Sequence, residues 1–212
     1  MDIIHSNISE QENTTQRYEV LRELGDCYAS AGSCEQARRC YEKAASLGPD
    51  EADPYVGLGV VAMQQGLLDD AEIAFRVACR LDSSCPKAYA GLAMVAQERA
   101  DYRRAFDMYL KCLELDTDNL TALLGLFQTS CKMGSFAQVI HYLELYLDMH
   151  PADGSVKFSL AALYVKEGRL AEAAALLRDV LTLDPGNVDA ANLLEEVEHG
   201  LSGPAFPIDG RR

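Results

Sequence analysis

The amino-acid sequence predicts an all-α fold, a solenoid of five helical hairpins followed by a capping helix. First, five segments of 34 residues align without an insertion or deletion, at 18–51, 52–85, 86–119, 120–153 and 154–187. Second, apolar residues recur inside each segment at steps of three and four, the period of a helix with one buried face. Third, a small residue separates two such stretches, at Gly32, Gly66, Ala100, Gly134 and Gly168. Because one hairpin cannot bury its apolar face alone, successive hairpins are expected to stack.

Each segment carries the residues that two closely packed helices need. Numbered from the first residue of each segment, position 7 is leucine in all five segments, while positions 8 and 20 are small in all but the fourth. Position 24 is large and is expected to fill the gap between the helices, at Tyr41, Phe75, Tyr109, Leu143 and Leu177. Glycine at position 15 is expected to end the first helix in a left-handed conformation, and proline at position 32 ends the second.

These residues closely resemble the pattern of the tetratricopeptide repeat family. Leucine and glycine at positions 7 and 8, glycine at 15, alanine at 20, an aromatic residue at 24 and proline at 32 carry the resemblance, which extends from residue 18 to residue 187. It implies a right-handed α-solenoid whose first helices line a concave groove. It indicates the fold far more specifically than the biochemical role, since the fold serves many partners.

The flanks are expected to differ from the repeats. Residues 1–17 are predicted to be a flexible lead and the start of the first helix, with residues 1–13 unstructured. Residues 188–200 place Ala191, Leu194 and Val197 at helical spacing beside acidic residues, which favours a capping helix ending at Gly200. Residues 201–212 contain two prolines and are predicted to be a flexible tail.

Composition and charge exclude several classes of protein. The chain has 33 acidic and 19 basic residues and a net charge of -14, which opposes binding to nucleic acid and to anionic membranes. It shows neither a secretory signal nor an apolar run long enough to span a membrane, so the expected location is the cytoplasm. The seven cysteines have no paired CxxC spacing and are expected to be reduced, without a metal. Because no catalytic motif occurs, we expect no enzyme activity and no cofactor.

The resemblance also implies which residues face a bound peptide, namely positions 2, 5, 6, 9, 12 and 13 of the first helices. The predicted binding residues are Arg22, Asp26, Val56, Gly57, Val60, Met63, Ala90, Gly91, Met94, Gln97, Leu124, Gln128, Cys131, Lys132, Phe158, Ala162, Val165 and Lys166. They are acidic near the first repeat, apolar in the middle and basic near the fourth and fifth. We expect an apolar peptide, extended or helical, with basic residues facing the first repeat and an acidic end facing Lys132 and Lys166.

Some of these assignments have a competing interpretation. Packing between repeats is the alternative explanation for Val56, Val60, Leu124 and Phe158. Glycine recurs at position 6, at Gly57, Gly91 and Gly125, although it costs about 1 kcal/mol relative to alanine inside a helix. These glycines either leave room for a ligand backbone or were inherited as the repeats duplicated. In both cases, replacing all three by alanine is predicted to stabilise the fold.

Three further features bear on specificity. Where the two helices of the fourth segment cross, the residues are larger than in the other segments, at Phe127, Val139 and Tyr146. This bulk predicts a local change of curvature or a docking site there. Cys131 is the thiol most exposed to a ligand, with a reactive role as the lesser alternative. Some members of the family bind a C-terminal carboxylate with a clamp of Lys, Asn and Arg. The resemblance places these clamp positions at Arg22, Asp26, Gly57, Lys87 and Gly91. Only two of the five are basic and Asp26 would repel a carboxylate, so this kind of binding is disfavoured.

The sequence therefore predicts a non-catalytic scaffold or adaptor that binds a peptide or partner protein. The alternative is a recognition arm or chaperone-like subunit of a larger enzyme or of a secretion or assembly machine. RNA binding is opposed by the uniform 34-residue period and by the acidic groove positions. Self-association is a further option, since residues 206–208 of the tail form a short apolar ligand for the groove of another copy.

Overall fold

The computed structural model describes the backbone of residues 2–202 and the side chains of residues 13–201. All regular secondary structure in this range is helical. The chain divides into two compact units, of which the first ends at Met133 and the second begins at Gly134. The boundary falls inside the fourth 34-residue segment, at the glycine that was expected to separate its two helices.

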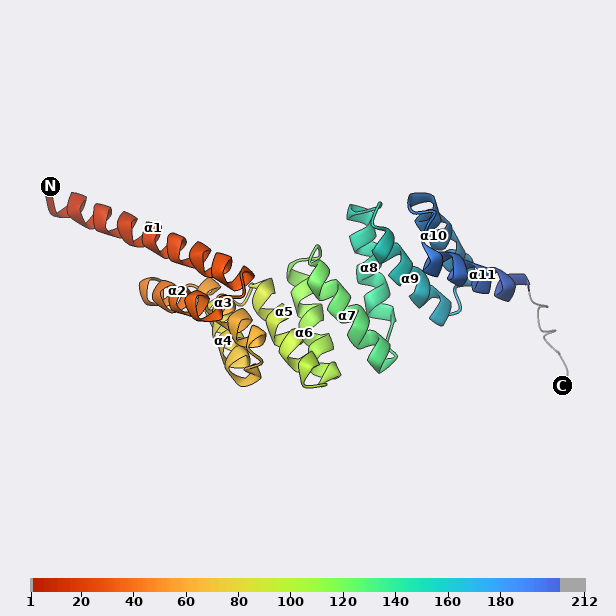
Figure 1. Ribbon diagram of the computed structural model, residues 1–212, viewed down its shortest axis with the longest axis horizontal. Coiled ribbons are helices and arrows are strands. Elements are labelled where there is room, and N and C mark those ends of the chain that lie inside the picture. The colour runs from red at the N-terminus through yellow and green to blue at the C-terminus, as the bar shows by residue number, and fades with distance from the viewer. Residues whose placement is uncertain (1, 203–212) are drawn as a thin grey trace. The chain divides into compact units, whose positions relative to one another are not determined.

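The first unit contains three hairpins and one further helix (Figure 1). Its helices are α1 (Asp2–Ser30), α2 (Cys34–Leu47), α3 (Asp53–Gln64), α4 (Leu68–Leu81), α5 (Pro86–Glu98), α6 (Tyr102–Leu115) and α7 (Leu120–Met133). The pairs α1–α2, α3–α4 and α5–α6 form the hairpins, and α2, α4 and α6 each pack against the first helix of the next segment. The hairpins therefore stack in sequence order, as a solenoid requires.

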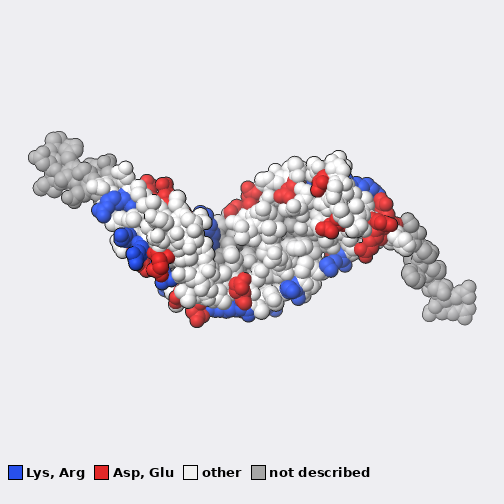
Figure 2. Space-filling model, in the orientation of Figure 1, with Lys and Arg blue, Asp and Glu red and all other residues white. Residues whose placement is uncertain are grey.

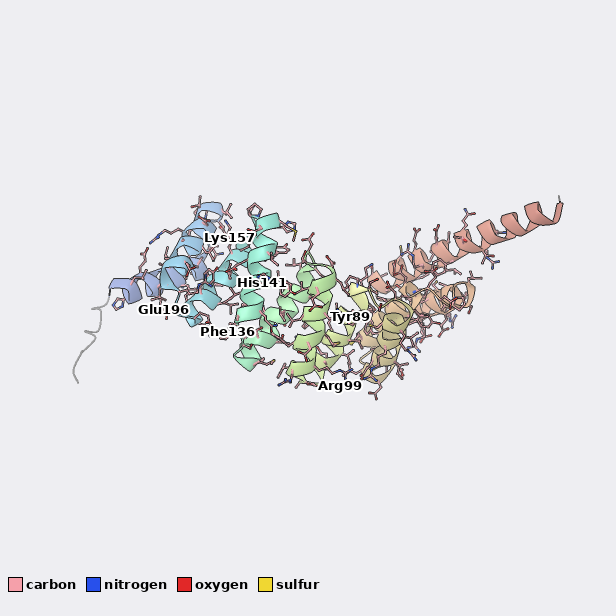
Figure 3. The ribbon with its side chains drawn as sticks, turned by 180° about the vertical axis from the view of Figure 1, so that it is seen from behind. Tyr89, Arg99, Phe136, His141, Lys157 and Glu196 are labelled. Atoms are coloured by element: carbon pink, nitrogen blue, oxygen red, sulfur yellow. The ribbon has the colours of Figure 1, made fainter. Side chains whose placement is uncertain are left out.

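The second unit contains α8 (Ala137–Met149), α9 (Gly154–Lys166), α10 (Leu170–Leu183) and α11 (Val188–Ser202). The helices α9 and α10 form a hairpin, α8 packs on α9, and α11 packs on α10. Lys157 of α9, labelled in Figure 3, pairs with Asp179 of α10 at 3.2 Å. Because α7 and α8 belong to different units, the count of five hairpins and the altered geometry of the fourth stay predictions.

The turn inside each hairpin follows the expected chemistry. Gly32, Gly66, Gly134 and Gly168 all have positive φ, between 70° and 74°. In the hairpin of α3 and α4, the amide of Leu67 donates to the carbonyl of Ala62 at 2.9 Å, which closes the end of the helix. Ala100 occupies the same turn position with φ 59° and is the one described non-glycine residue with positive φ. An alanine is strained in this region, so the third hairpin turn stores local strain.

The prediction for the N-terminus was wrong. Residues 2–30 form one continuous helix, α1, whereas residues 1–13 were expected to be unstructured. Figure 1 shows α1 extending well beyond its hairpin partner α2. Residues 2–16 contain no proline and no glycine, so nothing in the sequence interrupts the helix once the first repeat has started it.

The last helix runs past its expected end. α11 continues to Ser202, because Gly200 does not interrupt it. Its buried side is formed by Ala190, with no exposed surface, and Val197, 1% exposed, while Glu196 lies on its exposed side (Figure 3). Most of the predicted tail, with residues 206–208, lies outside the described residues.

Glycine and aromatic residues pack together between repeats. The buried ring of Phe75, 2% exposed, leaves no room for a Cβ at Gly59 of its own hairpin or at Gly91 of the next, since either atom would lie closer than 3.0 Å to the ring. Tyr41 is enclosed in the same way by Gly25 and Gly57. The recurrence of glycine at position 6 therefore has a structural cause that neither sequence interpretation had included. This packing argues against the prediction that alanine at these positions stabilises the fold, because a methyl group would collide with a buried ring.

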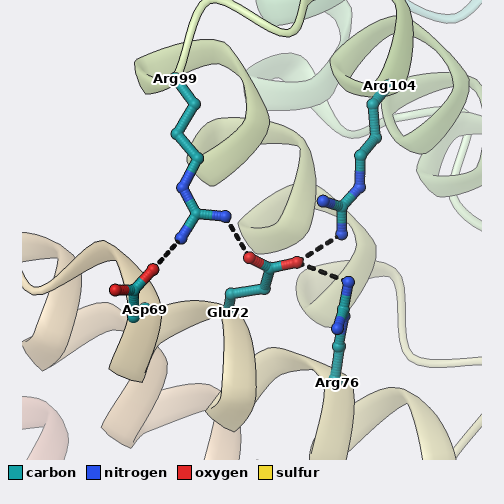
Figure 4. A network of polar contacts seen from close by, with 5 residues as sticks. All are labelled: Asp69, Glu72, Arg76, Arg99 and Arg104. Atoms are coloured by element: carbon teal, nitrogen blue, oxygen red, sulfur yellow. Dashed lines mark hydrogen bonds and ion pairs between the residues drawn. The ribbon is translucent and has the colours of Figure 1, made fainter.

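An ion-pair network ties the second hairpin to the third (Figure 4). The carboxylate of Glu72 on α4 accepts from Arg104 of α6 at 2.6 Å and from Arg99, at the end of α5. Arg76 of α4 also contacts Glu72 at 2.6 Å, and Asp69 receives the second amino group of Arg99 at 2.5 Å. Because Glu72 is 9% exposed, its charge depends on these arginines for compensation.

Candidate functional site

The first helices of the first unit present a continuous exposed side. Each of α1, α3 and α5 contacts the next helix of this set, ending with α7. We call this side the first-helix face and define it by its exposed residues Asp26, Val60, Met94, Leu124 and Gln128. All five were predicted to face a peptide.

A pocket of about 360 Å³ lies at the start of the first-helix face. It is lined from α1, α2, α3 and α5 by Arg22, Asp26, Ala29, Ser30, Tyr41, Asp53, Val56, Gly57, Val60, Gln64 and Lys87. Its wall carries the carboxylates of Asp26 and Asp53, the cations of Arg22 and Lys87, and the apolar side chain of Val60. A ligand here would therefore meet both charge signs beside an apolar surface.

Hydrogen bonds fix the charged side of this pocket. The hydroxyl of Tyr41 donates to Asp26 at 2.7 Å, and Arg22 pairs with the other oxygen of Asp26 at 3.4 Å. Burial, and then the hydrogen bond to Asp26, raises the pKa of Tyr41, which stays a proton donor at neutral pH. Gln64 donates to the backbone carbonyl of Ala29 at 3.3 Å. The carboxylate is thus held in place before any ligand binds.

A second hydrogen-bonded chain reaches the same face from α6. Tyr109 donates to Gln97 at 2.9 Å, and Gln97 donates to Gln128 of α7 at 3.0 Å. Sequence reasoning had treated Tyr41 and Tyr109 as fillers between helices and missed that both hydroxyls reach the binding face. The signal was present, because tyrosine and not phenylalanine occupies position 24 of these two segments.

The first-helix face also carries a row of exposed apolar side chains. Val60 of α3 is 39% exposed, Met94 of α5 is 40% exposed and Leu124 of α7 is 41% exposed. The three come from successive first helices, so they form a stripe that crosses the hairpins. Such a stripe suits the apolar side chains of a bound segment.

Other predicted binding residues are buried. Val56 and Ala90 are each 8% exposed, and Gly57 and Gly91 are buried against Tyr41 and Phe75. Val56 belongs to the core of the second hairpin, which Met63 also contacts. The two sequence interpretations therefore each describe part of the set: Val56 packs in the core, whereas Val60 and Leu124 are exposed.

The last turn of α7 is exposed and carries one basic residue, Lys132. Cys131 and Lys132 are both exposed, and Cys131 is a free thiol. By contrast, Cys112 has no exposed surface, and burial raises the pKa of its thiol to about 12, which fits a packing role.

The second unit holds the remaining predicted residues, all on α9. Phe158, Ala162 and Val165 are half-buried, and Lys166 is exposed. Nearby, Arg169 stacks on the ring of Tyr164 with its guanidinium carbon 3.9 Å from the ring centroid, and both contact Glu144. The residues of the predicted groove therefore fall into two sets, one in each unit, and a groove continuous over five repeats stays a prediction.

Neither a metal centre nor a membrane span stands out in the described part of the chain. Among the described side chains, those of residues 13–201, no group of three His, Cys, Asp or Glu is arranged to hold a metal ion. None of the described helices combines the length and the apolar character needed to cross a bilayer.

Comparison with known families decides the relationship. A family model described as tetratricopeptide repeat matches residues 22–86 and 132–188, more than half of the chain, and a second with the same description matches residues 86–119. The chain belongs to the tetratricopeptide repeat family. Tetratricopeptide repeat proteins are generally scaffolds for protein interaction.

Several curated proteins share sequence with this tetratricopeptide repeat chain. It is 24% identical over 187 residues to the Protein CTR9 homolog of Arabidopsis thaliana, covering 82% of this chain and 14% of that protein. It is 36% identical over 77 residues to the Type IV pilus assembly protein PilF of Pseudomonas aeruginosa, covering 36% and 31%. It is 26% identical over 111 residues to human Protein O-mannosyl-transferase TMTC1, covering 52% and 13%. The matched sequence therefore covers less than a third of each of these relatives.

Solved tetratricopeptide repeat structures share the fold. Pseudomonas aeruginosa PilF superposes with a TM-score of 0.72 at 22% identity, covering 89% of this chain and 86% of PilF. YrrB, described as a TPR protein with an unusual peptide-binding site, superposes with a TM-score of 0.67 at 25% identity, covering 76% and 83%. MamA superposes with a TM-score of 0.62 at 21% identity, covering 91% and all of that chain.

Proposed function

We propose that this protein is a non-catalytic adaptor that holds a segment of a partner protein against the first-helix face. The observation that carries the proposal is the exposed row of Val60, Met94 and Leu124 on the same face as two preorganised polar sites. The row supplies apolar contact area, and the fixed carboxylate of Asp26 and the amides of Gln97 and Gln128 supply orientation. YrrB, which shares the fold and is described as having an unusual peptide-binding site, supports peptide binding by a protein of this fold.

The charges on the face favour one polarity of the bound segment. Asp26 and Asp53 line the pocket on α1 and α3, which suits a basic residue of the partner, although Arg22 and Lys87 moderate that preference. Lys132 lies at the end of α7 and suits an acidic residue. We therefore propose a mainly apolar segment with a basic residue near α1 and an acidic residue near α7. Nucleic acid is a poor fit, since acidic residues exceed basic ones by 33 to 19.

We place this adaptor in a reducing compartment, the cytoplasm. All seven cysteines are free thiols, and Cys85 and Cys112 among them are buried as small apolar side chains.

The test is affinity capture with the wild-type protein and a Val60→Lys/Leu124→Lys variant, followed by titration of each specifically lost protein. Both positions are about 40% exposed, so the fold is expected to tolerate lysine there. An Ile73→Lys/Leu81→Lys variant is the matched control, because both residues are exposed on α4, away from the first-helix face. The proposal predicts a loss of affinity of tenfold or more, about 1.4 kcal/mol, for the first variant alone. Equal affinity of the folded variant and the wild type would contradict it.

A second candidate function is a recognition arm of a larger enzyme or assembly machine. The chain matches only 13% of TMTC1, which is named as a transferase, and resembles PilF, which is named as a pilus assembly protein. In that case the bound segment belongs to the same polypeptide or to a fixed complex. Sequencing the complete transcript and measuring the native mass of the endogenous complex distinguish this role from that of a free adaptor.

A further inference from the structure

The outer side of the first helix carries exposed apolar residues. Val20 is 49% exposed, Leu24 is 42% exposed and Tyr28 is 36% exposed, and all three lie on one side of α1. We call this side, with the adjoining end of α2, the N-terminal face. It is separate from the first-helix face, which α1 forms with Arg22 and Asp26.

In the other repeats, the equivalent side of the first helix is buried against a neighbouring helix. The residues at the position of Leu24 and Tyr28 in α5 are Leu92 and Ala96, which are 6% and 2% exposed. They are buried because α4, the second helix of the preceding hairpin, packs on α5. The N-terminal face therefore has the apolar pattern of a junction between repeats. Among the described helices, α1 packs on α2 and α3, and neither covers Val20, Leu24 or Tyr28. The missing counterpart is a helix.

The charges at this face indicate the chemistry of that helix. A pocket of about 640 Å³ lies between α1 and the end of α2, lined by Gln16, Arg17, Val20, Leu21, Lys43, Ser46 and Leu47. Both charged residues in its lining are cations, although the chain as a whole has a net charge of -14. Figure 2 shows several Lys and Arg side chains at this end of the first unit, with Asp and Glu side chains beside them. The apolar floor of this pocket between Arg17 and Lys43 suits an amphipathic helix with acidic residues along the edge that meets these two cations, whereas Glu23, on the same side of α1, lies outside the pocket lining.

A preceding repeat of the same kind does not fit this face. Inside the first unit, a ring at position 24 requires glycine at position 6 of the next segment, as with Tyr41 and Gly57. The N-terminal face has Glu23 at position 6, whose side chain would occupy the space of such a ring. The helix that binds here must present small or aliphatic side chains.

A second copy of this chain cannot stack end to end on the face through its last hairpin. α10, the final second helix, is covered by α11, and Leu177 of α10 has no exposed surface. The outward side of α11 carries Glu195 and Glu196 in place of an apolar stripe.

We propose that the N-terminal face binds an acidic amphipathic helix of a partner protein, with small or aliphatic residues against Val20 and Leu24 and acidic residues against Arg17 and Lys43. This site is independent of the segment bound at the first-helix face, so one adaptor joins two partners.

The probe is a synthetic helical peptide with alanine and leucine along one stripe and glutamate on both flanks. A matched peptide carries lysine in place of glutamate. Fluorescence anisotropy with the full chain is expected to show binding of the glutamate peptide and at least tenfold weaker binding of the lysine peptide. In an Arg17→Glu/Lys43→Glu variant, this preference is expected to reverse. An Arg80→Glu/Arg103→Glu variant removes the same charge from exposed sites on α4 and α6 and is expected to bind as the wild type does.

A Val20→Gln/Leu24→Gln variant tests the apolar part, and circular dichroism checks its fold. Both residues are more than 40% exposed, so the variant is expected to fold and to bind the glutamate peptide at least tenfold more weakly. Binding of neither peptide, equal binding of both, or loss of binding only in the Val60→Lys/Leu124→Lys variant would overturn the proposal. Sedimentation without peptide provides another check: a dimer that Val20→Gln/Leu24→Gln dissociates would mean that a second copy covers the face and would also overturn it.

Discussion

The ring of Phe75 occupies the space that a side chain on Gly91 would need. The two residues lie in successive hairpins, so their contact sets how closely α4 approaches α5. Tyr41 with Gly57, and Tyr109 with Gly125, repeat the arrangement at the neighbouring junctions. In the second unit, position 24 is the smaller Leu143 and position 6 of the next segment is Ser159. A large ring at position 24 thus occurs with glycine at position 6 of the next segment, and the smaller Leu143 occurs with Ser159.

We therefore expect Gly91→Ala to destabilise the protein, by about 1–3 kcal/mol, despite the better helix propensity of alanine. Urea denaturation measures the change. Gly154→Ala is the control, because a Cβ at Gly154 meets no atom within 4 Å. A Phe75→Leu/Gly91→Ala variant is expected to recover part of the loss relative to the sum of the single changes, as the pair Leu143 and Ser159 suggests. A Gly91→Ala variant as stable as the wild type would refute the packing argument.

The hairpin turn at Ala100 offers a stabilising change. Its φ of 59° is strained for alanine, whereas the corresponding turns have glycine. Ala100→Gly is expected to raise the free energy of unfolding by about 0.5–1 kcal/mol. The reverse change, Gly66→Ala, is expected to lower it by about 1 kcal/mol, although a Cβ there meets no atom within 4 Å. Opposite shifts of the denaturation midpoints check both, and shifts of the same sign would contradict the conformational explanation.

The network at Glu72 makes the first unit sensitive to acid. Hydrogen bonding from Arg104, reinforced by Arg99 and opposed by burial, holds the pKa of Glu72 below its ordinary value of 4.5. Since the folded-state pKa is the lower one, the stabilisation is fully present above about pH 4.5 and is lost as the pH falls through the folded-state pKa. Glu72→Gln is expected to cost about 1–3 kcal/mol at neutral pH, with a difference from the wild type that shrinks in acid.

Denaturation at a series of pH values measures this difference. Asp69→Asn is the matched control, because the Asp69 side chain is 94% exposed and its ion pair is expected to contribute less than about 1 kcal/mol. A Glu72→Gln penalty that stays constant into acid would rule out ionisation of Glu72 as the cause.

Tyr109 gives a matching prediction at alkaline pH. Burial raises the pKa of Tyr109 from 10.0 to about 12. The folded state therefore resists ionisation that the unfolded state undergoes, and this contribution to stability is present below pH 10 and declines as the pH rises towards about 12. Tyr109→Phe is expected to cost about 1 kcal/mol at neutral pH through the lost hydrogen bond to Gln97, but to lose less stability than the wild type above pH 10. Parallel pH profiles for the two proteins would show that Tyr109 does not titrate with unfolding.

Much of the site followed from repeat position, but exposure did not. Val60, Met94 and Leu124 are exposed as predicted for ligand-facing residues, whereas Val56 and Ala90, at the equivalent of the position of Leu124, are buried. A position within a repeat fixes the side of the helix, yet burial also depends on how large the facing residues of the next helix are. The repeat pattern does not say how closely the next helix approaches a given side chain.

The sequence by itself determined the helices, the hairpin turns and the family, because apolar periodicity and glycine at the turns act within a few residues of one another. Only the tertiary structure decided why glycine recurs at position 6, since Phe75 and Gly91 meet across two hairpins. It also decided that the Tyr41 hydroxyl reaches Asp26, and that Val20 and Leu24 stay exposed while their counterparts in later repeats are covered. These properties depend on which surfaces face each other once the hairpins have stacked, and contacts between residues distant in sequence fix that arrangement.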